Sequence, residues 1–141
     1  HVLEIDPLSE KLHIVMDLIR GGIGGLVLRG FGTGNVAYEH HEAVALAAER
    51  DVPVVVTTQC LQGSTAMERY ELGRKLLELG AIQGYDMGTE CIVTKLMWAL
   101  RRCSSAEEVG RVMHTDYVGE VERPGPGGPR TAIADAPFDN S

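Results

Sequence analysis

The sequence predicts an α/β domain in which a small, doubly wound parallel sheet is flanked by helices. Three observations carry this prediction: apolar runs alternate with stretches of helical periodicity, glycines follow the helical stretches, and a turn-like or polar segment follows each buried run. Strands that alternate with helices at this spacing are joined by right-handed crossovers, which make the strands parallel. With 141 residues, 44% of them hydrophobic, the chain has room for one such domain with a core.

The N-terminal elements follow from the spacing of apolar residues. Residues 2–5 are expected to form a short strand, and the Asp-Pro pair at 6–7 opens a helix because proline suits a first helical turn. The glycines at 21–22 end this helix, and the uninterrupted apolar run 25–28 predicts a strand buried on both faces. The apolar residues that share one face of the helix are Leu8, Leu12, Val15, Met16 and Ile19.

The middle of the chain repeats this alternation. Helical spacing covers residues 39–50, and the β-branched run 52–56 predicts the next strand. Residues 57–65 are polar and turn-like. Helical spacing then covers residues 68–79, and Gly80 is expected to close that helix.

The C-terminal elements are mostly helical. Residues 81–87 form a connector with room for a short strand, and a helix is expected over residues 89–100. Another helix is expected over residues 107–113. Ser105 is a suitable N-cap for it, because the serine hydroxyl can satisfy a free amide of the first turn.

Composition and charge exclude several classes of protein. The net charge is −7, from 13 basic and 20 acidic residues, so no basic surface for nucleic acid is expected. No apolar run reaches the roughly 18 residues of a membrane span, and no signal-peptide pattern opens the chain. Three cysteines without CxxC spacing argue against a disulfide framework and a structural zinc site, and favour a cytoplasmic location. The chain starts with His1, so we expect its reading frame to begin upstream.

Two loops are candidates for ligand binding, because parallel α/β domains bind ligands beyond the carboxyl ends of their strands. They cover residues 29–36 and 57–65, and the glycine spacing of the first fits neither common phosphate-binding motif. The Asn35 amide suits an amide or carboxylate ligand, although glycines around it are also typical of a tight turn. Arg29 ends a buried strand, where an unpaired guanidinium is costly, so it needs a carboxylate of the fold, a ligand or a partner chain.

The second loop contains Thr58 and Cys60 but no recognisable catalytic arrangement. No histidine lies near these residues in the sequence, and no G-x-S-x-G elbow is present. Cys60 is equally consistent with a small buried hydrophobic residue. The chain by itself is therefore predicted to bind a ligand but not to catalyse a reaction.

Other polar residues are interpreted as structural. Residues 40–42 lack the histidine spacing of an H-E-x-x-H metal site and are interpreted as an exposed helix start. Asp86 and Glu90 lie near a helix start, where capping is the favoured role. Lys95 is assigned to the helix surface.

Several segments resemble, in unbroken order, the C-terminal domain of type I, cytoplasmic L-asparaginases. The resemblance covers nearly all of residues 2–122 and is specific because several motifs occur together, whereas no counterpart is recognised from Pro124 onward. The segments that carry it are 28–35, 54–63, 70–77, 84–90, 94–98 and 119–120.

This resemblance implies a flavodoxin-like C-terminal α/β domain over residues 1–122, followed by a flexible tail over 123–141. In the family, the catalytic threonines and their lysine and aspartate partners lie in a larger N-terminal domain, which this chain lacks. The implied reaction is hydrolysis of L-asparagine to L-aspartate and ammonia through a threonine nucleophile, with no metal or organic cofactor. This chain alone is expected to be inactive.

The resemblance also implies roles for individual residues. Asn35 matches an asparagine that the family lends to the substrate pocket of a neighbouring protomer. Arg29, Thr58 and Cys60 match residues of a second, allosteric asparagine site at the subunit interface of some type I enzymes, where Arg29 would meet the ligand carboxylate in a bidentate fork. L-asparagine and identical subunits, in a homodimer or homotetramer, are the expected partners.

Two alternatives remain. The D subunit of the archaeal glutamyl-tRNA(Gln) amidotransferase shares this domain plan, but an acidic residue is common there in place of Arg29, which favours the free-standing asparaginase. The other alternative is a non-catalytic α/β module that binds a small ligand.

Overall fold

The computed structural model describes residues 1–5, 12–30, 40–58, 65, 67 and 71–122. The elements alternate in this part of the chain as the sequence predicts. They are β1 (Val2–Ile5), α1 (Leu12–Arg20), β2 (Gly25–Gly30), α2 (His40–Glu49), β3 (Val54–Thr58), α3 (Glu71–Glu78), β4 (Ile82–Gln83), α4 (Thr89–Leu100) and α5 (Ala106–Met113).

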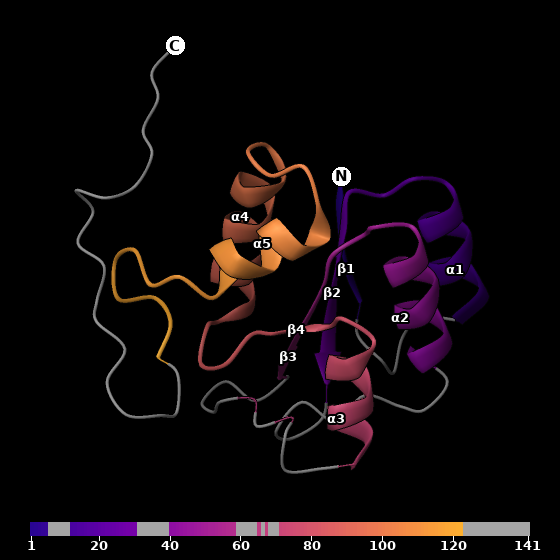
Figure 1. Cartoon of the computed structure of the whole chain (residues 1–141), viewed down its shortest axis with the longest axis horizontal. Coiled ribbons are helices and arrows are strands. Elements are labelled where there is room, and N and C mark those ends of the chain that lie inside the picture. The colour runs from indigo at the N-terminus through magenta and orange to yellow at the C-terminus, as the bar shows by residue number, and fades with distance from the viewer. Residues whose placement is uncertain (6–11, 31–39, 59–64, 66, 68–70, 123–141) are drawn as a thin grey trace.

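The described strands form one parallel, four-stranded sheet in the order β1-β2-β3-β4. Helices α1 and α2 lie on one side of this sheet, and α4 and α5 lie on the other (Figure 1). The predicted α/β class, a parallel sheet flanked by helices, is confirmed. The strand order follows the chain order without reversal, so the second helical layer is supplied by the two helices after β4. The sequence did not predict that detail.

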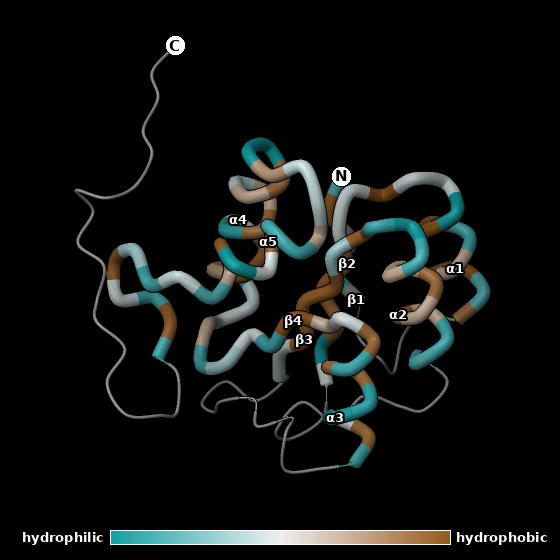
Figure 2. Tube along the Cα trace, viewed as in Figure 1, coloured by the Kyte–Doolittle hydropathy of each residue, from teal (hydrophilic) through white to brown (hydrophobic). Residues whose placement is uncertain are grey.

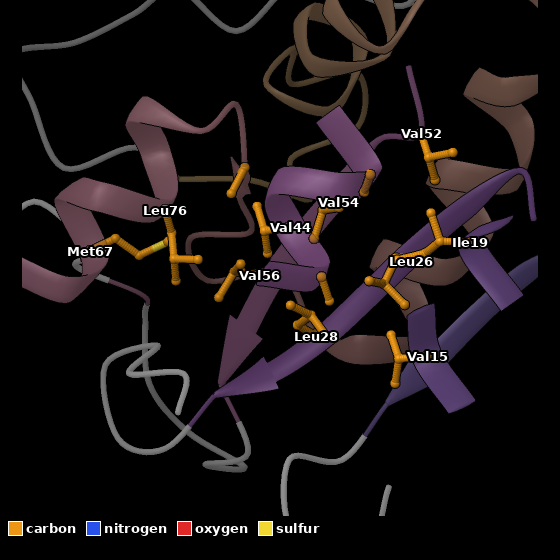
Figure 3. Packing of buried hydrophobic residues seen from close by; sticks show 13 residues of the cluster. Val15, Ile19, Leu26, Leu28, Val44, Val52, Val54, Val56, Met67 and Leu76 are labelled. Carbon is orange, nitrogen blue, oxygen red and sulfur yellow. The ribbon is translucent and has the colours of Figure 1, made fainter. Parts of the chain in front are cut away.

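Two apolar clusters hold these layers together. Figure 2 shows the hydrophobic strands at the centre of the molecule, between helices that carry most of the hydrophilic positions. The first cluster joins α1, α2 and α3 to the sheet through residues such as Ile19, Val44 and Leu76 (Figure 3). The second joins α4 and α5 to the opposite face through residues such as Leu96 and Met113. Each fully buried side chain of this size contributes about 1.5–3 kcal/mol relative to exposure, so both faces of the sheet stabilise the fold.

Glycine and serine set the helix boundaries. Gly22 and Gly80 have φ angles of +86° and +94°, a region that glycine enters without a Cβ penalty, and each follows a helix at the predicted place. The amide of Ala81 donates to the Leu76 carbonyl at 3.0 Å, which closes α3. The prediction for Ser105 is also confirmed, because its side chain accepts a hydrogen bond from the Glu108 amide at 3.3 Å.

Two strands differ from their predicted bounds. Strand β2 continues beyond 25–28 to Gly30, and β3 covers Val54–Thr58 rather than 52–56. The reason is backbone pairing: the ladder between the two strands extends to the pair of Gly30 and Thr58, although the apolar run has already ended. Pro53 lies outside the strand; its carbonyl accepts from Leu26, but it has no amide hydrogen to donate.

The interpretation of Asp86 as a helix cap is wrong. The N-cap of α4 is Gly88, and no side chain in the described part of the chain caps it. Asp86 Oδ1 instead accepts a hydrogen bond from the Glu122 amide at 2.7 Å. This contact connects Glu122, the last described residue, to the turn after β4. The two residues are 36 positions apart, so no local sequence pattern predicts the contact.

The assignment of Lys95 to the helix surface is also wrong, because this residue lies in the interior. Its side chain is 7% exposed, and Nζ lies 2.5 Å from Glu120 Oε1 and 2.6 Å from the Thr115 carbonyl. Burial alone would raise the pKa of Glu120, but the hydrogen bonds from Lys95 and the Val118 amide outweigh it and lower the pKa to about 2. The pair therefore ties the segment after α5 to α4.

Replacing Lys95 should leave the Glu120 carboxylate without its cationic partner. We expect Lys95→Met to lower the free energy of unfolding by about 3 kcal/mol at pH 7, measured by urea denaturation. Because the pKa of folded Glu120 is depressed, the pair stabilises the fold above the ordinary glutamate pKa, and this contribution is lost as the pH falls toward about 2. The matched control is Arg20→Met, which breaks an exposed ion pair with Asp17 and should change stability by about 0.5 kcal/mol or less. Equal effects of the two substitutions would contradict a structural role for the buried pair.

Candidate functional site

The carboxyl ends of the parallel strands form one rim of the sheet, and two of the predicted site residues lie on it. Arg29 is the penultimate residue of β2, and Thr58 is the last residue of β3. The predicted residues Asn35 and Cys60 lie outside the described residues. The structure thus places Arg29 and Thr58 on adjacent strands at the same rim, as the sequence predicts.

The alternation of side chains places these two residues on opposite faces of the sheet. Val27 and Val55 belong to the cluster under α4 and α5, whereas Leu28 and Val56 belong to the cluster under α1 to α3. Arg29 lies two residues after Val27 in β2, so it takes the face covered by α4 and α5. Thr58 lies two residues after Val56 in β3, so it takes the face covered by α1 to α3.

Thr57 is the rim residue that shares a face with Arg29. The two residues are register partners in the ladder between β2 and β3. A Cβ placed on Gly84 would lie 3.5 Å from Thr57 Cβ and 2.8 Å from Ile92 Cδ1, so Thr57 faces α4. Thr57 belongs to the second candidate loop of the sequence, but its face was not predicted, because the unbroken run of valines before it does not reveal which face each residue takes.

Arg29 has only a loose ionic partner in the described part of the chain. Its Nη1 lies 3.4 Å from Glu4 Oε1, longer than a strong charge-assisted hydrogen bond, and the two side chains are 31% and 42% exposed. The Nε atom is buried and has no hydrogen-bond partner among the described residues. The Glu4 carboxylate therefore lies near the Arg29 guanidinium but does not bind two of its N–H donors in parallel.

A second group of polar residues lies at the carboxyl end of β4, where hydrogen bonds link Gln83, Thr65 and Tyr85. Gln83 Nε2 donates to the Thr65 carbonyl at 2.7 Å, and the Thr65 amide donates to the Tyr85 carbonyl at 2.9 Å. The Tyr85 ring packs against the His114 ring, with centroids 5.4 Å apart. The sequence offered one weak signal for this group, a polar residue between Ile82 and a glycine.

The start of α2 is partly buried: its interpretation as an exposed helix start is wrong for His40 and His41, whereas Glu42 is exposed. His40 and His41 are 4% and 9% exposed, and neither ring nitrogen of His40 has a hydrogen-bond partner within the part of the chain that the structure describes. Burial lowers the pKa of His41, and the nearby positive charges of Lys75 and His40 lower it further. Both histidines belong to the buried side of α2, together with Ala43, Val44 and Ala47.

A groove of about 720 Å³ lies at the other end of the sheet, mostly beside the amino ends of β3 and β4. Its position excludes the rim residues Arg29, Thr57 and Thr58. The residues that line it are Val44, Ala48, Val52, Val54, Leu79, Gly80, Ile82, Ala106, Glu107, Gly110, Arg111, His114 and Thr115.

The described residues contain neither a cluster of metal-binding side chains nor a helix that could span a membrane. No group of three or more His, Cys, Asp and Glu side chains there is arranged to hold a metal ion. Within the same residues, no helix combines the length and apolar character needed to cross a bilayer. Cys91 and Cys103 are free thiols, and burial is the main reason that their pKa values are raised.

Comparisons with known proteins match most of the chain. The glutaminase/asparaginase C-terminal domain family matches residues 10–113. An L-asparaginase of Thermococcus kodakarensis is 38% identical over 109 residues, which cover 76% of this chain and 33% of that protein. The D subunit of the glutamyl-tRNA(Gln) amidotransferase of Methanopyrus kandleri is 41% identical over 101 residues, covering 72% of this chain and 22% of that protein. The chain thus spans a third or less of these relatives.

Solved structures support the same relationship. The thermostable L-asparaginase from Thermococcus kodakarensis superposes with a TM-score of 0.79 and 36% identity, over 86% of this chain and 38% of that one. L-asparaginase I from Vibrio cholerae superposes with a TM-score of 0.74 and 32% identity, over 86% of this chain and 37% of that one.

The buried start of α2 should make stability sensitive to pH. The pKa of folded His41 lies below its ordinary value, so the unfolded chain binds more protons and stability falls as the pH drops through about 6.5. We expect His41→Gln to reduce the dependence of the free energy of unfolding on pH between about pH 7.5 and 5.5. The slope should decrease by less than about 1.4 kcal/mol per pH unit, the maximum for a single proton. Thermal unfolding across this range measures it, with His13→Gln on the exposed side of α1 as the control. Identical pH slopes for wild type and His41→Gln would exclude His41 as the cause.

Proposed function

Because this chain belongs to the glutaminase/asparaginase C-terminal domain family, we propose that it is the C-terminal domain of an L-asparaginase. The reaction is the hydrolysis of L-asparagine to L-aspartate and ammonia. The nucleophilic threonine lies in an N-terminal domain outside this chain. This chain, as residues 1–122 with a tail over 123–141, contributes residues to the substrate pocket, to the subunit interface and to an allosteric site.

The observation that supports this proposal most directly is the state of Arg29. Its guanidinium lies at the carboxyl rim, 31% exposed, with a long contact to Glu4 and a buried Nε that no described residue hydrogen-bonds. A guanidinium binds a carboxylate best through two parallel N–H donors, and Arg29 retains that capacity. Asparagine carries an α-carboxylate that suits this fork, and Thr58 and Cys60 complete the proposed allosteric site.

The chain contributes orientation to the chemistry rather than bond breaking. The threonine oxygen attacks the side-chain amide carbon, the C–N bond breaks, and ammonia leaves with the transferred proton. Water then hydrolyses the acyl-enzyme, and hydrogen-bond donors stabilise the oxyanion in both steps. Asn35 holds the α-amino end of the substrate in a neighbouring protomer, which lowers the entropic cost of reaction. The protein acts in the cytoplasm as a homodimer or homotetramer and needs no metal or organic cofactor.

The second candidate function is that of the D subunit of the archaeal glutamyl-tRNA(Gln) amidotransferase. The Methanopyrus relative, at 41% identity, supports it. Arg29 favours the asparaginase, since a basic residue at this position can bind the carboxylate of a free amino acid. Ammonia release from free asparagine, in the absence of tRNA, separates the two functions.

The first experiment compares this chain with a longer protein that also includes the coding region preceding it. We expect the 141-residue chain to release no ammonia from asparagine or glutamine, because the nucleophile is absent, and the longer protein to release it from asparagine. A coupled assay for ammonia measures both. Turnover by the 141-residue chain above a heat-denatured control would contradict the placement of the nucleophile elsewhere.

The second experiment tests Arg29 in the longer protein. We expect Arg29→Ala to weaken a sigmoidal response to asparagine and to raise the half-saturating concentration about tenfold, the equivalent of about 1.4 kcal/mol. Steady-state kinetics with a fitted Hill coefficient provide the measurement. Arg102→Ala removes the same charge from an exposed arginine stacked on Trp98 and serves as the control. An unchanged Hill coefficient in a cooperative parent would remove Arg29 from the allosteric site.

A further inference from the structure

Gln83 connects the sheet to Thr65 at the carboxyl rim. Its side chain is buried, with 1% of the residue exposed, and its amide Nε2 donates to the Thr65 carbonyl at 2.7 Å. The main chain of Gln83 is itself fixed on two sides, by its register with Val56 in β3 and by the 3.1 Å contact between its carbonyl and His114 Nε2. The side-chain amide therefore extends from a rigid support.

Thr65 is also held by the turn that follows β4. Its amide donates to the Tyr85 carbonyl at 2.9 Å, and its hydroxyl lies 3.5 Å from the same oxygen. Tyr85 has a φ angle of 51°, which is uncommon for a residue with a side chain, so the surrounding contacts hold this turn in a strained conformation. The Gly84 amide adds a hydrogen bond of 2.8 Å to the Val56 carbonyl.

The position of Thr65 matters because of what surrounds it in the sequence. Thr58 is the last residue of β3 and pairs with Gly30, whereas Thr65 is the next buried residue that the structure describes. Cys60 lies between the two in the sequence. The contact from Gln83 therefore fixes the first described residue after β3.

We propose that Gln83 is a positioning residue for the asparagine response: its amide holds Thr65 in place relative to Thr58. This inference rests on the proposed function. The other atom of the same amide, Oε1, is buried and finds no hydrogen-bond partner in the described ranges of the chain. A buried oxygen without a partner is unfavourable, so a side chain that served only to fill space would be better replaced by an apolar one. Compared with an apolar side chain, the amide of Gln83 adds the hydrogen bond that Nε2 donates to the Thr65 carbonyl.

Two substitutions remove this donor in different ways. Gln83→Leu has a similar volume and no amide, and Gln83→Asn keeps an amide that is one methylene too short to reach the Thr65 carbonyl. In the longer protein, we expect both to raise the half-saturating asparagine concentration about fivefold while kcat stays within about twofold, because the nucleophile lies elsewhere. The Thr65 amide should exchange with deuterium about tenfold faster, with β2 amides unchanged. Thr94→Val, which removes an exposed hydroxyl bound to the Glu90 carbonyl, is the control.

Each outcome decides a separate part of the proposal. Thr65 exchange as slow as wild type in both variants would overturn the anchoring contact. Faster exchange with an unchanged half-saturating concentration would overturn the positioning role. An effect of Gln83→Leu that Gln83→Asn does not share would assign the effect to polarity instead of the hydrogen bond. A wild-type protein without asparaginase activity would overturn the proposed function, whereas the exchange data would still decide the anchor.

Discussion

The structure depends on a sheet that is buried on both faces. Strand β3 is buried throughout and contributes Val54 and Val56 to one core and Val55 to the other, so neither layer of helices can be removed without exposing it. Parallel strands that each return through a helix bring all their carboxyl ends to one edge. In β2 and β3 the polar residues lie only at that edge, as Arg29, Thr57 and Thr58. Burial thus determines where binding residues can stand.

The rim differs from the rest of the molecule in how its polar groups are satisfied. In the interior, Lys95 and Glu120 form a short ion pair with additional backbone partners, as a buried pair requires. At the rim, within the described residues, Arg29 keeps a buried donor without a partner, and the amide of Gln83 uses only its donor side. Unsatisfied polar atoms are costly, so the rim differs from the interior in holding buried polar atoms for which the described residues supply no partner.

The second helical layer links stability to the rim. The ion pair of Lys95 and Glu120 holds the segment after α5 against α4, and the Glu122 amide then reaches Asp86 in the turn after β4. Tyr85, the neighbour of Asp86, accepts the Thr65 amide. The buried ion pair and the rim are thus joined by contacts that each lie within two residues of the next along the chain.

The sequence by itself determined the order of elements, the parallel sheet and the helix ends, because apolar periodicity, glycine and a capping serine act over a few residues. It also placed Arg29 at the carboxyl rim, since chain order decides which strand ends carry loops. Only the tertiary structure decided which face each rim residue takes, that Lys95 and the histidines of α2 are buried, and that Gln83 reaches Thr65. Those facts depend on strand register and on contacts between residues 18 to 36 positions apart, which no local pattern encodes.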